Sequence, residues 1–169
     1  LLIGGAFTQL DVSFDSFIGG CTVAQDIAYR AANRTVVSTP MGPRVIYGTC
    51  TQDLNGKTGV FAPEMSTSLF AEYVVAGTSD FNIVLGADVN KVGEFYSQND
   101  LDPANLSPET TKANLRMGVE AADEKWSITI FGRNVTNEIG RSFGVDLPLI
   151  SGSHVAYLDP GREVGMRFR

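Results

Sequence analysis

The strongest constraint on the fold of this chain comes from residues 115–137, where apolar and polar side chains alternate in two short runs. Alternation with a period of two places one set of side chains on each face of a β-strand. Folding the runs about the polar turn 122–125 pairs Ala121 with Trp126, Val119 with Ile128 and Met117 with Ile130. The sequence therefore predicts a β-hairpin with one apolar face, whose register is fixed because a one-residue slip would invert every side chain.

The same alternation recurs in four further segments. It predicts strands over residues 1–17, 60–75, 81–97 and 161–169. The second and third of these segments are joined by the short turn 76–80. Folding them back about this turn places Tyr73 opposite Ile83 and Ala71 opposite Leu85. Together with the first hairpin, these segments predict six antiparallel strands.

The connections between these strands alternate in length. Short polar turns at 76–80 and 122–125 alternate with long irregular segments at about 18–58, 98–110 and 139–160. This arrangement is typical of bacterial outer-membrane barrels, which have short periplasmic turns and long extracellular loops. Because a single-chain barrel needs about eight strands to close, the sequence predicts an all-β fold that is an antiparallel transmembrane β-barrel fragment of about six strands.

Composition argues against other classes of protein. The 169 residues carry a net charge of −6 without a basic cluster, so we expect no nucleic-acid partner. No segment approaches the roughly 20 apolar residues of a membrane helix. The chain opens on LLIGGAF, without an initiator Met or a signal peptide, and we expect it to belong to a longer polypeptide.

The face opposite the apolar one carries many polar groups. A dry core would leave them without hydrogen-bond partners, at a cost of about 2 kcal/mol or more each, so we expect them to face a water-filled or plugged lumen. They are Gln9, Asp11, Ser68, Glu72, Asn82, Asp88, Asn90, Asn114, Arg116, Glu120, Arg133 and Arg167. Arg116, Arg133 and Arg167 can attract anionic ligands, but we favour their pairing with Glu120, Glu163 and neighbouring acids.

Both cysteines, Cys21 and Cys50, lie in the first long segment. We predict that they form a disulfide in an oxidising compartment, worth about 3–4 kcal/mol from loop-closure entropy. The alternative is two unrelated thiols in a reducing cell.

The third long segment contains His154, the only histidine, and Tyr157. No nucleophile elbow accompanies His154, so we predict no catalytic residues. Asp100 and Asp102 lack the glycine and distal glutamate of a helix–loop–helix calcium site, so we predict no metal site and no cofactor.

Several motifs resemble the C-terminal part of the TonB-dependent outer-membrane receptors. They are NLRMGVEAADEKWSITIFGRNVTNE (114–138), DPGREVGMRFR (159–169), FAPEMSTSLFAEY (61–73) and FYSQNDLDP (95–103). The resemblance covers residues 54–169 well and residues 1–53 only by the layout of strand and loop. The chain departs from the family at its end, where Arg169 follows Phe168 and the family usually finishes on an aromatic residue.

The resemblance implies that residues 1–169 are the C-terminal portion of a barrel of about 22 strands closed by an N-terminal plug domain. The plug is absent from this chain. Such a receptor lies among outer-membrane lipids and imports a scarce nutrient, such as a ferric siderophore, cobalamin or a carbohydrate. The TonB–ExbB–ExbD complex drives the import through the plug. Within this picture, the loop closed by Cys21 and Cys50 and the loop around His154 and Tyr157 are the expected contacts for an extracellular small-molecule ligand.

Two other classes of protein share parts of this pattern. A passive porin-like channel or an autotransporter pore has the same strand layout without a plug. A secreted, carbohydrate-binding β-sandwich would require Leu85, Ile128 and Ile130 to face a second sheet.

Overall fold

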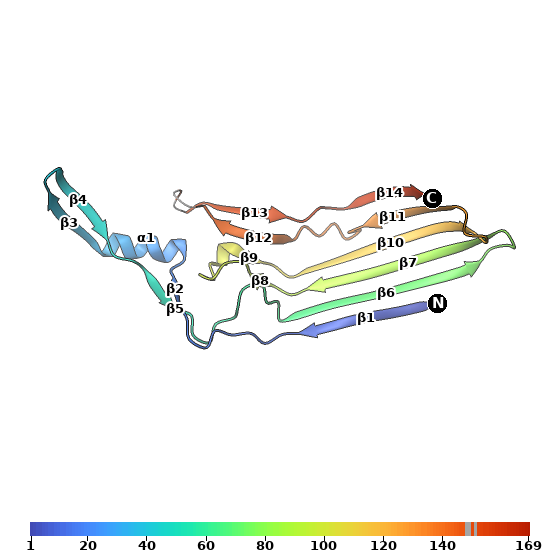
Figure 1. Ribbon diagram of the computed structural model, residues 1–169, viewed down its shortest axis with the longest axis horizontal. Coiled ribbons are helices and arrows are strands. Elements are labelled where there is room, and N and C mark those ends of the chain that lie inside the picture. The colour runs from blue at the N-terminus through green and yellow to red at the C-terminus, as the bar shows by residue number, and fades with distance from the viewer. Residues whose placement is uncertain (148–149, 151) are drawn as a thin grey trace.

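The computed structural model is built around one open antiparallel sheet with the strand order β1-β6-β7-β10-β11-β14 (Figure 1). The structure describes all residues except 148, 149 and 151. The six strands are β1 (Leu2–Gln9), β6 (Met65–Ala76), β7 (Phe81–Val92), β10 (Thr110–Ala121), β11 (Ser127–Arg133) and β14 (Glu163–Phe168). The expected all-β, antiparallel fold with six main strands is confirmed. Within the described residues the sheet does not close on itself, and β1 and β14 are its edges.

The register of the two short-turn hairpins tests the pairing predicted from the sequence. In β10–β11, Met117 pairs with Ile130 and Val119 with Ile128, as predicted. In β6–β7 the prediction is wrong by two residues, because Tyr73 pairs with Leu85 and Ala71 pairs with Ala87.

The turn between β6 and β7 explains this error. The backbone N–H groups of Gly77 and Thr78 both donate to the carbonyl oxygen of Phe81, at 3.2 and 3.1 Å. The hairpin therefore closes more tightly than the expected five-residue turn, and Ala76 pairs with Asn82. A shift of two residues keeps every side chain on its predicted face.

The first strand is shorter than predicted, because β1 ends at Gln9 rather than at residue 17. It pairs with β6 so that Ala6 lies opposite Ser68 and Gln9 opposite Met65. Gln9 therefore lies on the same face as Leu69, which corrects its assignment to the polar face, and Asp11 lies beyond the strand.

The long segments contain structure that alternation did not reveal. The first includes β2 (Ile18–Gly20), α1 (Val23–Ala32), β3 (Arg34–Thr39), β4 (Gly42–Tyr47) and β5 (Thr51–Asp53). Helix α1 begins with a capping box, in which Thr22 and Gln25 satisfy each other's backbone N–H groups. Strands β3 and β4 form a hairpin that projects farthest from the sheet (Figure 1).

The other long segments contribute short paired strands. They contain β8 (Phe95–Tyr96), the 3₁₀-helix η1 (Pro103–Asn105), β9 (Leu106–Ser107), β12 (Arg141–Asp146) and β13 (His154–Leu158). Strand β8 pairs with β9, and β12 pairs with β13. Among the described residues, no helix has the length and apolar character needed to cross a membrane.

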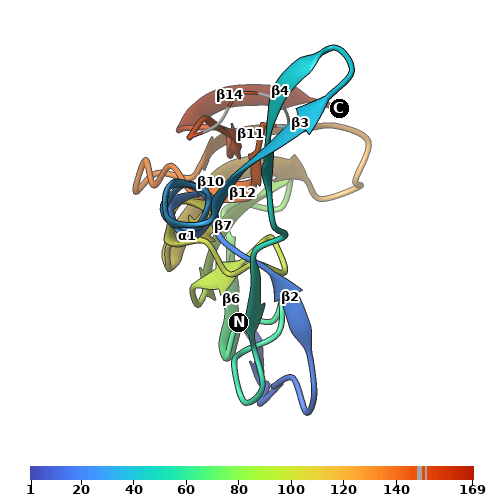
Figure 2. The same ribbon diagram turned by 90° about the vertical axis from the view of Figure 1, so that its left-hand side faces the viewer.

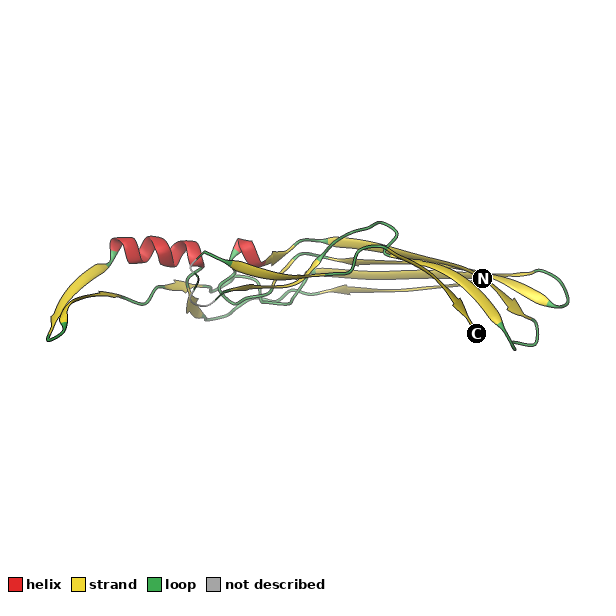
Figure 3. Ribbon diagram, turned by 90° about the horizontal axis from the view of Figure 1, so that it is seen from above, coloured by secondary structure: helices red, strands yellow, loops and turns green. Residues whose placement is uncertain are grey.

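The sheet is a single layer without a conventional core (Figure 3). Among the described residues, Leu54 and Ala121 are the only hydrophobic side chains that are buried, at 3 % and 4 % exposure. One face of the sheet, here called the apolar face, exposes a continuous series of large hydrophobic side chains. They are Leu69, Tyr73, Leu85, Val89, Leu115, Met117, Ile128, Ile130, Val164, Met166 and Phe168.

Candidate functional site

The molecule has two distinct ends. Both termini and the two short turns lie at one end of the sheet, and the long segments gather at the other (Figure 1). We call the described residues within 10–64, 93–109 and 134–162 the loop cluster. Figure 2 views this end, with β3, β4 and α1 towards the reader. Candidate binding residues lie in two places, the polar face of the sheet and the loop cluster.

The polar face is the side of the sheet opposite the apolar face. Strand pairing places Arg116 beside Phe131, Arg167 beside Thr129, and Glu120 beside Ser127. Arg133 pairs with Glu163 on the same face. The structure thus gathers on one face Arg116, Glu120, Arg133 and Arg167.

The arginines of this face are partly neutralised by acids. Arg133 forms an ion pair with Glu163 at 3.5 Å, as predicted. Arg116 pairs with Glu72 of β6, one of the neighbouring acids expected as partners, and its side chain reaches Glu72 across Gly86 of β7. Among the described residues, Glu120 makes no ion pair within 4.0 Å.

Phe131 interrupts the alternation of β11, and the structure shows its role. The guanidinium groups of Arg133 and Arg167 lie 5.2 and 5.9 Å from the centre of its ring, within range of cation–π attraction. These residues border a hollow of about 250 Å³ together with Asp88 and Asn114. The hollow combines arginine side chains, an amide and the Asp88 carboxylate, a composition that suits a polar contact.

Three large side chains on the polar face lie flat against glycines of the neighbouring strand. A Cβ atom added to Gly165 would lie 2.6 Å from the Phe131 ring, and one added to Gly4 would lie 2.6 Å from Phe70. Arg116 covers Gly86 in the same way. Glycine is thus required at these positions for close approach of a side chain to the backbone.

A chain of hydrogen bonds links the middle of the polar face to the loop cluster. Asn90 and Asn114 both donate to the carboxylate of Asp88, at 3.0 and 2.6 Å. Asn114 in turn accepts from the backbone N–H of Asn134, at 2.7 Å. Aspartate and asparagine on adjacent strands therefore satisfy one another within the sheet.

Asn134, which follows β11, forms hydrogen bonds to the segment that precedes β14. It is 6 % exposed and has a positive φ of 47°. Its side-chain amide donates to the carbonyl oxygens of Glu138 and Pro160, at 2.9 and 3.1 Å, and accepts from the N–H of Glu138. This part of the NVTNE motif is a structural corner, not an exposed site.

The two cysteines are joined at the base of the longest excursion. Cys21 follows β2 and Cys50 precedes β5, and the structure connects them by a disulfide with a Cα–Cα distance of 5.6 Å. The disulfide thus closes a covalent loop that contains α1 and the β3–β4 hairpin.

A polar centre holds the loop cluster together. The Ser97 hydroxyl lies within hydrogen-bond distance of the carbonyl oxygens of Asn105 and Gly144, at 3.1 and 2.7 Å, and accepts from the N–H of Gly144. Asn105 is completely buried and donates to Asp146 at 2.6 Å. The buried residues of this region are thus mainly polar, and hydrogen bonds stabilise them.

His154 borders this polar centre. Its Nδ1 atom lies 2.8 Å from a carboxylate oxygen of Asp146, and both side chains are partly exposed. Asp100 and Asp102 lie nearby. Burial raises the pKa of Asp100 above its ordinary value, and the negative charges of Asp146 and Asp102 raise it further, against the opposing backbone N–H of Asp102.

The structure does not bring His154 and Tyr157 together. In the β12–β13 ladder, His154 pairs with Asp146 and Tyr157 with Phe143, so the two side chains point to opposite faces of this hairpin. Tyr157 instead contacts Phe143, which stacks on Phe61 at 6.2 Å. A ligand on one face of the hairpin would meet only one of the two residues expected to bind it.

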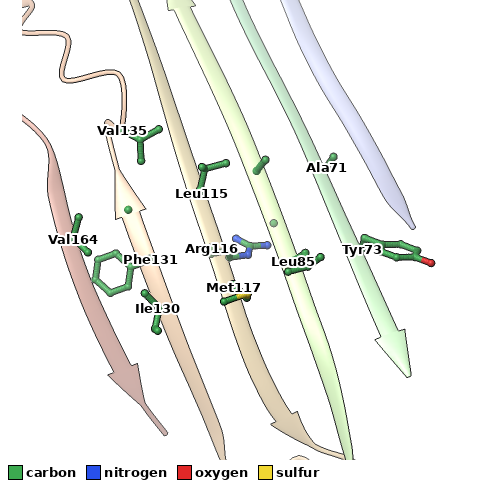
Figure 4. Close-up of a pocket in the computed structure, with 13 residues that line it drawn as sticks. Ala71, Tyr73, Leu85, Leu115, Arg116, Met117, Ile130, Phe131, Val135 and Val164 are labelled. Carbon is green, nitrogen blue, oxygen red and sulfur yellow. The ribbon is translucent and has the colours of Figure 1, made fainter. Parts of the chain in front are cut away.

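A wide, open hollow lies over the apolar face (Figure 4). It has a volume of about 580 Å³ and is lined largely by hydrophobic side chains, including Tyr73, Leu85, Met117 and Ile130.

Sequence reasoning missed the role of Asp146 and Asn105, which belong to different long segments. Pairing of β12 with β13 places Asp146 beside His154, and no local spacing motif signals this contact.

Comparison of the chain with family models, curated proteins and solved structures found no match.

Proposed function

We propose that this chain is the C-terminal barrel wall and outer loops of a TonB-dependent outer-membrane receptor. The receptor imports a scarce nutrient, such as a ferric siderophore, cobalamin or a carbohydrate. The observation that carries the proposal is the uncovered apolar face of a sheet whose two short turns lie at one end and whose long loops lie at the other.

The energetics of the apolar face support a lipid environment. Ile130, Val164 and Met166 are 51 %, 74 % and 71 % exposed, and each side chain favours a non-aqueous surrounding by about 1.5–3 kcal/mol. Monomeric soluble proteins rarely leave a large continuous apolar surface in water. Lipid tails would cover this face along its whole length.

The same observation weighs against the secreted β-sandwich. That fold would require a second sheet over Leu85, Ile128 and Ile130. In the described part of the chain, these residues remain 39 %, 39 % and 51 % exposed, and every other sheet has two strands.

In the proposed receptor, the polar face lines the barrel and meets the plug domain. Arg133, which is paired with Glu163, and Arg167, which lies over the Phe131 ring, would offer cations to acidic or carbonyl groups of the plug. The loop cluster, at the extracellular end, helps to hold the ligand, and the TonB–ExbB–ExbD complex rearranges the plug. The chain makes no covalent bonds in this process.

The test uses the intact protein that carries this chain. We expect it to fractionate with outer membranes and to migrate faster on a gel unheated than boiled, as folded barrels do. Ligand uptake should then require TonB, whereas a passive pore would conduct without TonB. A soluble protein whose migration is insensitive to heating would contradict the membrane assignment.

A further inference from the structure

We propose that Asp102, Asp146 and His154 bind a divalent transition-metal ion in the loop cluster. One candidate ligand atom from each residue lies within 4.8 Å of the other two. Asp102 precedes η1, Asp146 ends β12 and His154 begins β13, so the site forms only when the long segments fold together. The proposal does not depend on the transport function.

The charges at this site favour a cation. Asp102 is only 7 % exposed. Within the described residues, no Lys or Arg forms an ion pair with Asp102 or Asp146, and His154 is the sole basic partner of Asp146. The Asp102 carboxylate is withdrawn from water and accepts hydrogen bonds from the backbone N–H groups of Val23 and Ala104, without a cationic partner among the described residues. A divalent ion would supply the charge that a buried carboxylate favours.

A second observation points to a ligand at the same place. The amide nitrogen of Asn105 is directed at Asp146, but its amide oxygen accepts no hydrogen bond from any described residue, although Asn105 is fully buried. Buried polar atoms almost always have a partner. The unpartnered oxygen lies beside Gly144 and belongs to the same amide group whose nitrogen donates to Asp146, so an unsatisfied polar atom adjoins the Asp102–Asp146–His154 group.

The donor set indicates which ions fit. Imidazole nitrogen combined with carboxylate oxygen suits Zn²⁺, Mn²⁺ or Fe²⁺, whereas Ca²⁺ and Mg²⁺ prefer oxygen alone. His154 Nδ1 and Asp146 Oδ1 are 2.8 Å apart. Adjacent ligands of an octahedral ion with bonds of about 2.1 Å lie about 3.0 Å apart. The ion would thus bind between these two atoms in place of their direct contact, with little movement of either side chain.

Metal binding here would connect separate parts of the loop cluster. Asp102 already accepts a hydrogen bond from the backbone N–H of Val23, at the start of α1, at 3.3 Å. An ion held by Asp102, Asp146 and His154 would therefore fix α1 relative to the β12–β13 hairpin. The site also revises the expectation from Asp100 and Asp102 alone, because the donors beside Asp102 come from residues distant in sequence.

Isothermal titration calorimetry of the chelator-treated, intact protein tests the proposal, with Zn²⁺ alone as the probe. We expect saturable binding that is weakened about tenfold or more in His154→Gln and Asp146→Asn. Asp15→Asn, a matched change at an exposed loop position, should leave this binding unchanged. Ca²⁺ should bind far more weakly than Zn²⁺.

A second measurement decides the question even if Asp146→Asn fails to fold. In protein labelled with ¹⁵N-histidine, the signal missing from His154→Gln identifies the His154 ring, and Zn²⁺ should shift that signal. Equal Zn²⁺ binding by wild type and His154→Gln, or a His154 signal that Zn²⁺ does not move, would overturn the proposal.

Discussion

The six-stranded sheet and the loop cluster are stabilised in different ways. In the sheet, regular backbone pairing joins the strands, and the large hydrophobic side chains of the apolar face remain exposed. In the loop cluster, short strands surround buried polar residues such as Ser97 and Asn105, and a disulfide closes the longest excursion.

This difference shows which part of the chain depends on its surroundings. One face of the sheet leaves its large hydrophobic side chains uncovered. In the proposed receptor lipid would cover them, and burial of apolar surface is the dominant favourable term in folding. The loop cluster instead relies on hydrogen bonds between specific side-chain and backbone groups. Each such bond contributes about 1 kcal/mol to stability, but a buried polar group without a partner costs more. The two regions should therefore respond differently to the same perturbation.

Loss of the disulfide should have the largest effect, and only in the loop cluster. Replacing Cys21 and Cys50 together by Ser should destabilise the excursion by about 3–4 kcal/mol, because the unfolded loop regains its conformational entropy. Hydrogen exchange should accelerate within residues 21–50 while β6 and β7 keep their protection. If exchange accelerated equally in residues 21–50 and in β6 and β7, the two regions would not be independent.

A charge on the apolar face should act on the sheet. In the proposed membrane barrel, Ile130→Arg should reduce the free energy of unfolding in lipid by about 2–4 kcal/mol, since the substituted side chain would place a cation in the hydrocarbon. Thr129→Arg is the matched control, because Thr129 belongs to the polar face. Reversible unfolding in vesicles measures both variants, and equal losses would show that the two faces are not distinguished by their environment.

Asn134 tests the boundary between the two regions. Asn134→Ala should destabilise the protein by about 2–3 kcal/mol, because the carbonyls of Glu138 and Pro160 lose a donor and alanine tolerates a positive φ poorly. Glycine adopts a positive φ without strain but makes no side-chain hydrogen bonds. Asn134→Gly should therefore be destabilised by about 1 kcal/mol less than Asn134→Ala. Chemical unfolding in detergent micelles separates these terms, and identical stability in Asn134→Ala and wild type would exclude the corner role.

Acid should weaken the ion pair between Lys112 of β10 and Asp159 of the loop cluster. The hydrogen bond from Lys112 lowers the pKa of Asp159, and the Ser142 hydroxyl lowers it further. Its stabilisation is therefore fully present above the unfolded pKa of about 3.9 and is lost as the pH falls through the lower folded pKa. At pH 7, Asp159→Asn should cost about 1 kcal/mol.

Unfolding of wild type and Asp159→Asn at several pH values measures this contribution. The difference between them should shrink as the pH falls below the unfolded pKa of Asp159. Asp123→Asn is the control, because Asp123 is fully exposed and its pair with Lys125 should not affect stability measurably. A difference that grows on acidification would reverse the assigned sign.

The sheet was largely predictable from the sequence because period-two alternation specifies both the strand and its faces. It fixed the pairing of Met117 with Ile130. It did not fix the β6–β7 register, since a two-residue shift preserves the alternation and only the hydrogen bonds of Gly77 and Thr78 distinguish the two registers.

The loop cluster was far less predictable. The capping box of Thr22 and Gln25 was a readable signal for α1 that alternation alone overlooked. The contacts among Asp102, Asp146 and His154 carried no such signal, because they depend on how the separate segments pack. Local patterns specify local structure, but a site assembled from distant segments follows from the tertiary fold.

The glycines of the polar face determine how far that surface projects. Because Phe131 lies across Gly165, Phe70 across Gly4 and Arg116 across Gly86, these bulky groups lie along the wall and leave the space in front of it clear. A methyl group on Gly165 would force the Phe131 ring to move, because the added carbon would lie 2.6 Å from it. In the proposed receptor this face would line the barrel beside a moving plug, and three residues without side chains would keep that lining smooth.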